Sequence, residues 1–178
     1  IGFEGNKKKK STVYEKNGMH ANGSTGVAVL RRDGFVSYSA QKEKGTLVTR
    51  PVTFTGEYLF VNVNCPNGEL KVEVLDADNK VIQGFSANDC KPLTVDSTIA
   101  QIRWKNKKDL STLKSQSVRF KFYLTNGDLY SFWVSPDTEG ASNGYNAAGG
   151  PGFSGGIDKE GMRAYKKAQD FPNLLERC

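Results

Sequence analysis

This chain offers few candidate catalytic residues. Its only histidine, His20, lies in a stretch without hydrophobic periodicity, so a Ser-His-Asp or Cys-His centre lacks a well-placed base. The three cysteines form no Cys-x-x-Cys pair, which argues against zinc. Paired carboxylates could serve glycoside hydrolysis, but the acidic residues fall in predicted turns or on solvent faces. The sequence therefore predicts a protein that is not an enzyme.

Acidic residues in the middle of the chain leave one cofactor open. Carboxylate and carbonyl oxygens suit Ca²⁺, although the spacing here is not that of an EF-hand. A structural calcium ion is therefore the only cofactor that we consider. The candidate ligands are Asp76, Asp78, Asp89 and Asp96.

Aromatic side chains gather toward the end of the predicted β region, where they could form a binding surface. Aromatic rings stack on the apolar faces of sugars, and charged groups orient hydroxyls and acids. We expect Tyr130 to be the leading candidate because its hydroxyl gives the ring a polar handle. Trp104 and Trp133 are expected to be core rings, and binding residues only if exposed. Arg32 and Asp33 are the candidates for charged contacts.

The cysteines and one asparagine bear on the compartment. Cys65 and Cys90 could form a disulfide if the protein is extracellular, and three free thiols are the alternative. Cys178 would then be free or linked to another chain. Asn22 begins Asn-Gly-Ser, an acceptor sequence for glycosylation in secreted eukaryotic proteins.

Charge points to the class of partner. The formal net charge is +6 over 178 residues, and part of it lies in Lys7–Lys10. A basic balance favours polyanions such as acidic polysaccharide or an anionic mineral surface. No nucleic-acid-binding signature is present. No apolar run approaches the ~20 residues that a membrane helix needs, so we expect neither nucleic acid nor membrane as a partner.

The elements that would position these residues are strands. Leu70, Val72 and Val74 alternate with Lys71 and Glu73, which is the period of a half-buried strand. An Asp-Ala-Asp-Asn turn follows, and the chain then returns. We count roughly nine or ten such short strands with no regular helix between them, which is typical of an antiparallel β-sandwich or jelly roll.

The last two strands give the clearest pattern. Phe120 and Phe122 alternate with polar residues in 118–124, so we expect both rings in the core. Thr-Asn-Gly-Asp at 125–128 then predicts a β-hairpin with a type I′ turn and a returning strand at 129–134.

Alternation in that returning strand also assigns its faces. It places Tyr130 and Phe132 on one side and Ser131 and Trp133 on the other. One of these two sets must belong to the core.

Composition divides the chain into four parts. Residues 1–23 form a flexible basic arm rich in Gly and Lys, and residues 24–134 form the β-sandwich. Residues 135–157 form a Gly-rich loop. Residues 158–178 form a tail with a short helix that Asp158 caps.

Four segments stand out as a set: Leu30-Arg-Arg-Asp-Gly-Phe35, Leu59-Phe-Val-Asn62, Gly68-Glu-Leu-Lys-Val-Glu-Val-Leu-Asp76 and Leu129-Tyr-Ser-Phe-Trp133. Taken together, they resemble a C-terminal β-sandwich module of secreted proteins similar to family 32 glycoside hydrolases. Those proteins are built as a β-propeller followed by a sandwich, and their catalytic carboxylates belong to the propeller. The resemblance covers roughly residues 24–152 and implies a module without catalytic machinery.

These observations lead to a secreted, non-catalytic β-sandwich that binds carbohydrate, with acidic polysaccharide among the candidates. One alternative is a structural, matrix or biomineral-associated protein that self-assembles, as a homo-oligomer or through Cys178. Another is an accessory fragment of a glycoside hydrolase.

Overall fold

The computed structural model describes residue 26, residues 30–146 and residues 152–169. The expected basic arm, the acceptor Asn22 and the terminal Cys178 lie outside the described residues. The chain divides into two units, residues 1–30 and 31–178, and every element below belongs to the second.

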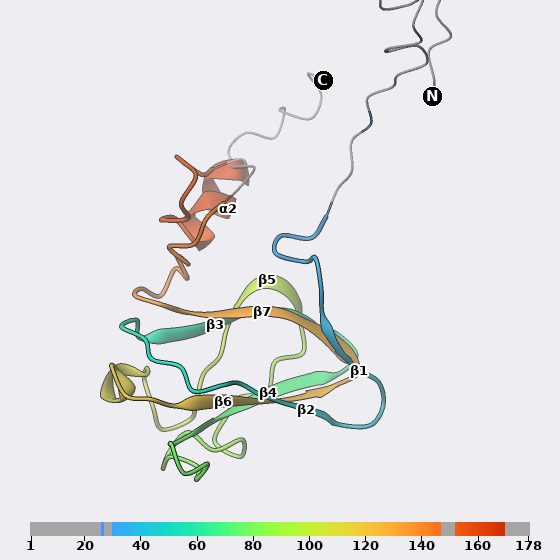
Figure 1. The fold of residues 1–178 in the computed structure, drawn as a ribbon. Coiled ribbons are helices and arrows are strands. Elements are labelled where there is room, and N and C mark those ends of the chain that lie inside the picture. The colour runs from blue at the N-terminus through green and yellow to red at the C-terminus, as the bar shows by residue number, and fades with distance from the viewer. Residues whose placement is uncertain (1–25, 27–29, 147–151, 170–178) are drawn as a thin grey trace, which may run out of the picture. The chain divides into compact units, whose positions relative to one another are not determined.

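The second unit is an all-β sandwich of two antiparallel sheets, as the sequence predicts (Figure 1). The larger sheet has the strand order β1-β7-β3-β5, and the smaller has the order β2-β6-β4. The described residues form seven strands, fewer than we expected, because several short apolar stretches remain irregular. The strands are β1 (Tyr38–Ala40), β2 (Gly45–Val48), β3 (Tyr58–Asn64), β4 (Glu69–Leu75), β5 (Asp96–Gln101), β6 (Arg119–Thr125) and β7 (Gly127–Ser135).

The core lies between the two sheets. Phe120 and Phe122 of β6 are buried there and pack against Phe132 of β7, with ring centroids 5.8 and 5.2 Å away. The prediction for these two rings is confirmed, because a strand with one apolar face must turn that face inward. Trp104 is also buried and donates its indole N–H to the Val72 carbonyl.

The predicted hairpin between the last two strands is wrong. β6 belongs to the smaller sheet and β7 to the larger one, so the chain crosses between sheets at Asn126. Asn126 has a positive φ of 52°, but Gly127 does not, whereas a type I′ turn needs both. Gly127 serves another purpose: a Cβ there would lie 2.5 Å from the Asn64 carbonyl oxygen. Glycine therefore allows β7 to start against the end of β3.

A β-bulge at Tyr130 overturns the predicted faces of β7. Asn62 pairs with Ser131 and the next residue of β3 pairs with Leu129, so Tyr130 is an extra residue. Leu129 and Phe132 both pack into the core as a result. Tyr130 lies on the outer face. The guanidinium carbon of Arg31 lies over the Tyr130 ring, 4.8 Å from the ring centre. A single inserted residue has shifted the alternation by one.

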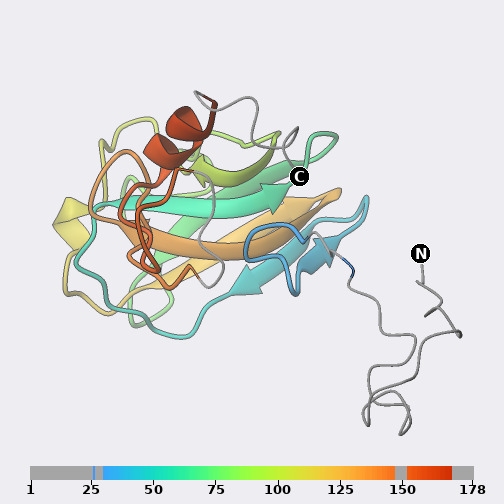
Figure 2. The same ribbon diagram turned by 90° about the horizontal axis from the view of Figure 1, so that it is seen from above.

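Residues 152–169, called the C-terminal segment below, lie along the outer face of the larger sheet, and α2 (Met162–Gln169) is part of them (Figure 2). The helix begins later than the predicted Asp158, whose Oδ1 instead accepts the backbone N–H of Gly161 at 2.8 Å. The hydroxyl of Tyr165 lies 2.9 Å from Thr98 Oγ1 of β5, which anchors α2 to the sheet. In the part of the chain that is described, no helix has the length and apolar character to cross a membrane.

Candidate functional site

Two adjacent arginines, Arg31 and Arg32, make side-chain contacts on the outer face of the larger sheet. Arg31 Nε donates to Asn62 Oδ1 at 2.6 Å, and its Nη1 pairs with Asp96 at 2.5 Å. The Asn62 amide in turn donates to the Arg32 carbonyl. Asn62 is almost fully buried, so this exchange satisfies a polar group that would otherwise be costly to bury. Arg31 therefore serves the fold.

Arg32, a predicted carbohydrate contact, is used by a buried ion pair. Its Nη2 lies 2.6 Å from Asp158 Oδ2, and the Asp158 side chain is only 1% exposed. Its guanidinium also lies over the Phe153 ring at 5.0 Å. Arg32 thus holds the C-terminal segment and has little freedom to bind a ligand. Its neighbour Asp33 is exposed in a turn with a φ of 49°.

The predicted aromatic candidates are not brought together as one surface. Trp104 is 4% exposed and belongs to the core, so it contributes nothing to a surface site. Trp133 stacks on the buried Phe60 at 5.8 Å and donates its indole N–H to the Gly140 carbonyl. Tyr130 is partly exposed, but Arg31 occupies a face of its ring. No row of free ring faces results from these three residues.

The two described cysteines are buried free thiols, not the disulfide that we expected for an oxidising compartment. Cys65 follows β3 and donates to the Leu93 carbonyl at 3.3 Å. Cys90 lies beside β4 in the other sheet, where its sulfur accepts the Val72 N–H at 3.3 Å. Each thiol thus has its own partners. Burial raises the pKa of both, so the reactive thiolate is disfavoured.

The four aspartates that we considered for calcium are dispersed. Asp76 closes its own turn by accepting the backbone N–H of Asp78 at 2.9 Å, and Asp96 pairs with Arg31. Asp89 accepts a hydrogen bond from a neighbouring serine. Within residues 30–146 and 152–169, no three His, Cys, Asp or Glu side chains converge as a metal site would require.

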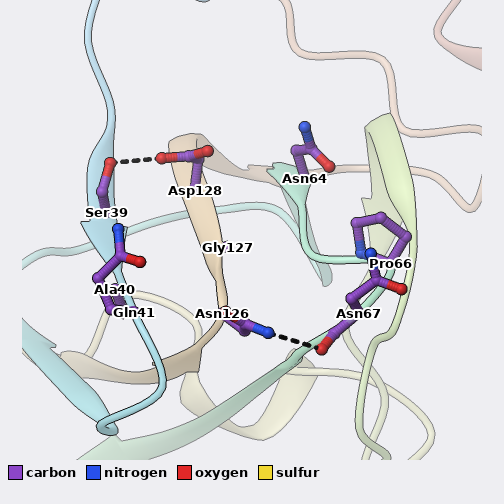
Figure 3. Close-up of a pocket in the computed structure, with 9 residues that line it drawn as sticks. All are labelled: Ser39, Ala40, Gln41, Asn64, Pro66, Asn67, Asn126, Gly127 and Asp128. Carbon is purple, nitrogen blue, oxygen red and sulfur yellow. Dashed lines mark hydrogen bonds between the residues drawn. The ribbon is translucent and has the colours of Figure 1, made fainter.

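A polar cleft lies at one end of the sandwich, where β1, β3 and β7 meet (Figure 3). Its volume is about 460 Å³, within the range of about 300–1,000 Å³ that is usual for small-molecule sites. Ala40, Pro66 and Gly127 supply its small and apolar surface. Its polar lining consists of Ser39, Gln41, Asn64, Asn67, Asn126 and Asp128.

Local geometry fixes two of the cleft residues. Asn126 donates its backbone N–H to the Gln41 carbonyl at 2.8 Å and its amide to the Asn67 carbonyl at 3.1 Å. The Asp128 carboxylate accepts the Ser39 hydroxyl, as the dashed line in Figure 3 shows. These bonds tie β1, the β3–β4 turn and the β6–β7 crossing together.

Other polar groups of the cleft are left available. The side-chain amides of Gln41, Asn64 and Asn67 make no hydrogen bond to any other described residue. Each amide carries both a donor and an acceptor in one plane. Of the cleft-lining residues in the described part of the chain, Asp128 is the only charged one. The arrangement suits an uncharged ligand with many hydroxyl groups.

Sequence reasoning missed this cleft because its residues come from separate turns. Gln41, Asn64 and Asn126 have no periodic relation, and each reads as an ordinary turn asparagine or glutamine. The Thr-Asn-Gly-Asp stretch was the one available signal, and we interpreted it as a hairpin. The crossing between sheets is what brings it beside the end of β3.

Comparison with known proteins adds no family assignment. No family model matches the chain, and no curated protein matches it in sequence.

Proposed function

We propose that this protein is a non-catalytic β-sandwich module that binds a neutral carbohydrate in the cleft lined by Gln41, Asn64, Asn67 and Asp128. The observation that carries the proposal is the set of unused amide groups around a cleft of about 460 Å³. A planar amide can donate to one sugar hydroxyl and accept from the next, as a vicinal diol requires.

The charge of the cleft narrows the ligand class. A site for an acidic sugar would present Lys or Arg, but among the described residues that line this cleft Asp128 alone is charged, and it carries a carboxylate. The basic character of the whole chain resides elsewhere. Neutral sugars are therefore favoured over the acidic polysaccharide that net charge alone suggests.

The chemistry of the cleft favours binding over hydrolysis. Glycoside hydrolysis generally uses two carboxyl groups on either side of the bond, and one carboxylate lines the cleft. The extracellular location and the likeness to a sandwich module of family 32 glycoside hydrolases remain part of the proposal. Both are supported by the sequence segments alone.

A glycan array with neutral and acidic oligosaccharides, read at low and high salt, tests the ligand class. We expect binding to neutral glycans that is nearly independent of salt, because none of the described residues that line the cleft is a cation. Binding to every polyanion, lost at high salt, would contradict the proposal and favour a polyanion-binding surface. Parallel arms with Ca²⁺ and with a chelator show whether a metal ion takes part.

Matched asparagine variants localise the site. Asn67→Ala and Asn64→Ala each remove an unused amide from the cleft, whereas Asn106→Ala removes an exposed amide elsewhere. We expect the first two to weaken binding about tenfold, the effect of losing one or two good hydrogen bonds. Equal binding by all three variants would place the site outside the cleft.

A further inference from the structure

Two neighbouring apolar side chains are left in solvent at the entrance to β1. Phe35 is 85% exposed and Val36 is 76% exposed, which places both among the most exposed large apolar residues of the described chain, together with Tyr145 at 76%. Isolated exposed apolar residues are common, but an adjacent pair beside an apolar groove marks an interaction surface.

The groove beside them is an opening into the sandwich. It has a volume of about 440 Å³ and lies between the edges of the two sheets. Leu47 comes from β2 in one sheet, and Leu129 and Phe132 come from β7 in the other. Val36, Tyr38 and Tyr130 also line it, together with two serines. Phe35 is too exposed to fill the groove of its own chain.

The groove exists because β1 is short. β1 pairs with β7 only from Gly127 to Leu129, and in the described residues β7 has no further strand partner on that side. The stretch from Tyr130 to Val134 therefore presents a sheet edge to solvent. That stretch contains no charged residue and no proline, the usual protections of an exposed edge. By contrast, β5, the strand at the opposite edge of the larger sheet, has a protective charge, because it starts with the exposed Asp96.

We propose that this groove and edge form a self-association surface, in which Phe35 of each copy enters the groove of a second copy. The surface is self-complementary, since one chain carries both an exposed aromatic side chain and an unfilled apolar groove. Two copies with a net charge of +6 repel one another at long range, and a contact face without cations does not add to that repulsion. None of the described residues that line this groove is charged.

A two-fold arrangement follows from the reciprocity of the contact. It would extend each larger sheet past β7 and remove two exposed edges. β1 contributes Tyr38 to the groove and Ser39 to the polar cleft, so the dimer would carry two clefts close to its interface. If the clefts bind carbohydrate, a polymer with repeated units would gain avidity from the pair. The dimer itself does not depend on that function.

Sedimentation equilibrium from micromolar to hundreds of micromolar concentration tests the proposal. We expect a monomer–dimer equilibrium for the unaltered chain. Phe35→Asp should raise the dimer dissociation constant at least about tenfold, because it replaces a central aromatic contact by a charge. Its high exposure in the monomer means that the change leaves the fold intact. Val81→Asp is the matched control. Val81 is an exposed valine that does not line the groove, so its replacement should leave dimerisation unchanged.

A mixing experiment tests the reciprocal geometry. Val36→Asp alters the groove and keeps Phe35, while Phe35→Asp alters the aromatic residue and keeps the groove. Each variant alone should be monomeric, and their mixture should restore one of the two contacts as a weaker heterodimer. A chain that is monomeric at every concentration overturns the proposal and leaves the groove to a partner of another kind. A dimer that persists in both variants overturns it as well, because the interface then lies elsewhere.

Discussion

The buried ion pair between Arg32 and Asp158 should be the largest single polar contribution to the attachment of the C-terminal segment. The perturbation that isolates it is Asp158→Asn, which keeps the shape and removes the charge. Asp158 Oδ1 accepts the backbone N–H of Gly161 at 2.8 Å, and Oδ2 accepts from Arg32 at 2.6 Å and from Ser142 Oγ at 3.0 Å. Whichever way the new amide turns, its NH₂ group faces one of these donors.

The magnitude follows from burial. Removing one partner of a buried ion pair usually costs about 3–5 kcal/mol, because the other charge is left without compensation. The Arg32 side chain is 22% exposed, so water offsets part of this cost. We expect Asp158→Asn to lower the free energy of unfolding by about 2–4 kcal/mol. That is a large fraction of the ~5–15 kcal/mol that stabilises a typical domain.

The stability difference between wild type and Asp158→Asn should depend on pH and become smaller in acid. Burial alone would raise the pKa of Asp158, but the hydrogen bonds from Gly161, Arg32 and Ser142 outweigh it and lower that pKa. A carboxyl group with a lowered pKa in the folded state stabilises the fold above its unfolded pKa of about 3.9. That stabilisation is lost as the pH falls through the lower, folded value. The gap between wild type and Asp158→Asn should therefore close in acid.

Urea denaturation followed by tryptophan fluorescence measures the effect. With a slope of about 2 kcal/mol per molar urea, the midpoint should fall by about 1–2 M. Asp78→Asn is the control, since Asp78 lies exposed in the turn after β4. Arg32→Met combined with Asp158→Asn should cost less than the sum of the two single changes. If Asp158→Asn and Asp78→Asn unfold at the same urea concentration, the ion pair does not have the role assigned to it.

Three further predictions concern the core, the thiols and the sheet crossing. Phe120→Ala should cost about 3–5 kcal/mol in urea denaturation, against less than about 0.5 kcal/mol for Val81→Ala; similar losses for the two would contradict the core assignment. Cys65 and Cys90 should react slowly with a thiol reagent in the native protein and rapidly in denaturant, and fast native labelling would show that they are not buried as described. Gly127→Ala should lower the melting temperature by several degrees, because its Cβ would lie 2.6 Å from the Cβ of Cys65; an unchanged melting temperature would show that the contact is looser.

The faces of the regular strands could be predicted from sequence. In β6 the alternation of Phe120 and Phe122 with polar residues encodes directly which side is buried. The same holds for Leu70 and Val72 in β4. Such patterns are local, so no knowledge of the partner sheet is needed.

Features that depend on distant parts of the chain could not be predicted in the same way. A bulge at Tyr130 reverses the faces of β7, and bulges have no simple signature in a single sequence. The Asn-Gly pair suits a hairpin and also suits this crossing between sheets, and packing against the end of β3 decides between them. Arg32 and Asp158 lie 126 positions apart, so their pairing emerges only from the fold.

The most direct test of the proposed carbohydrate site is a titration of ¹⁵N-labelled protein with a neutral oligosaccharide identified on the array. We expect amide shifts to concentrate at Gln41, Asn64, Asn67 and Asp128, and the Asn67→Ala variant to lose most of them. Shifts that cluster on another face, or the absence of any shift with every neutral sugar tried, would contradict the assignment of this cleft as a carbohydrate site.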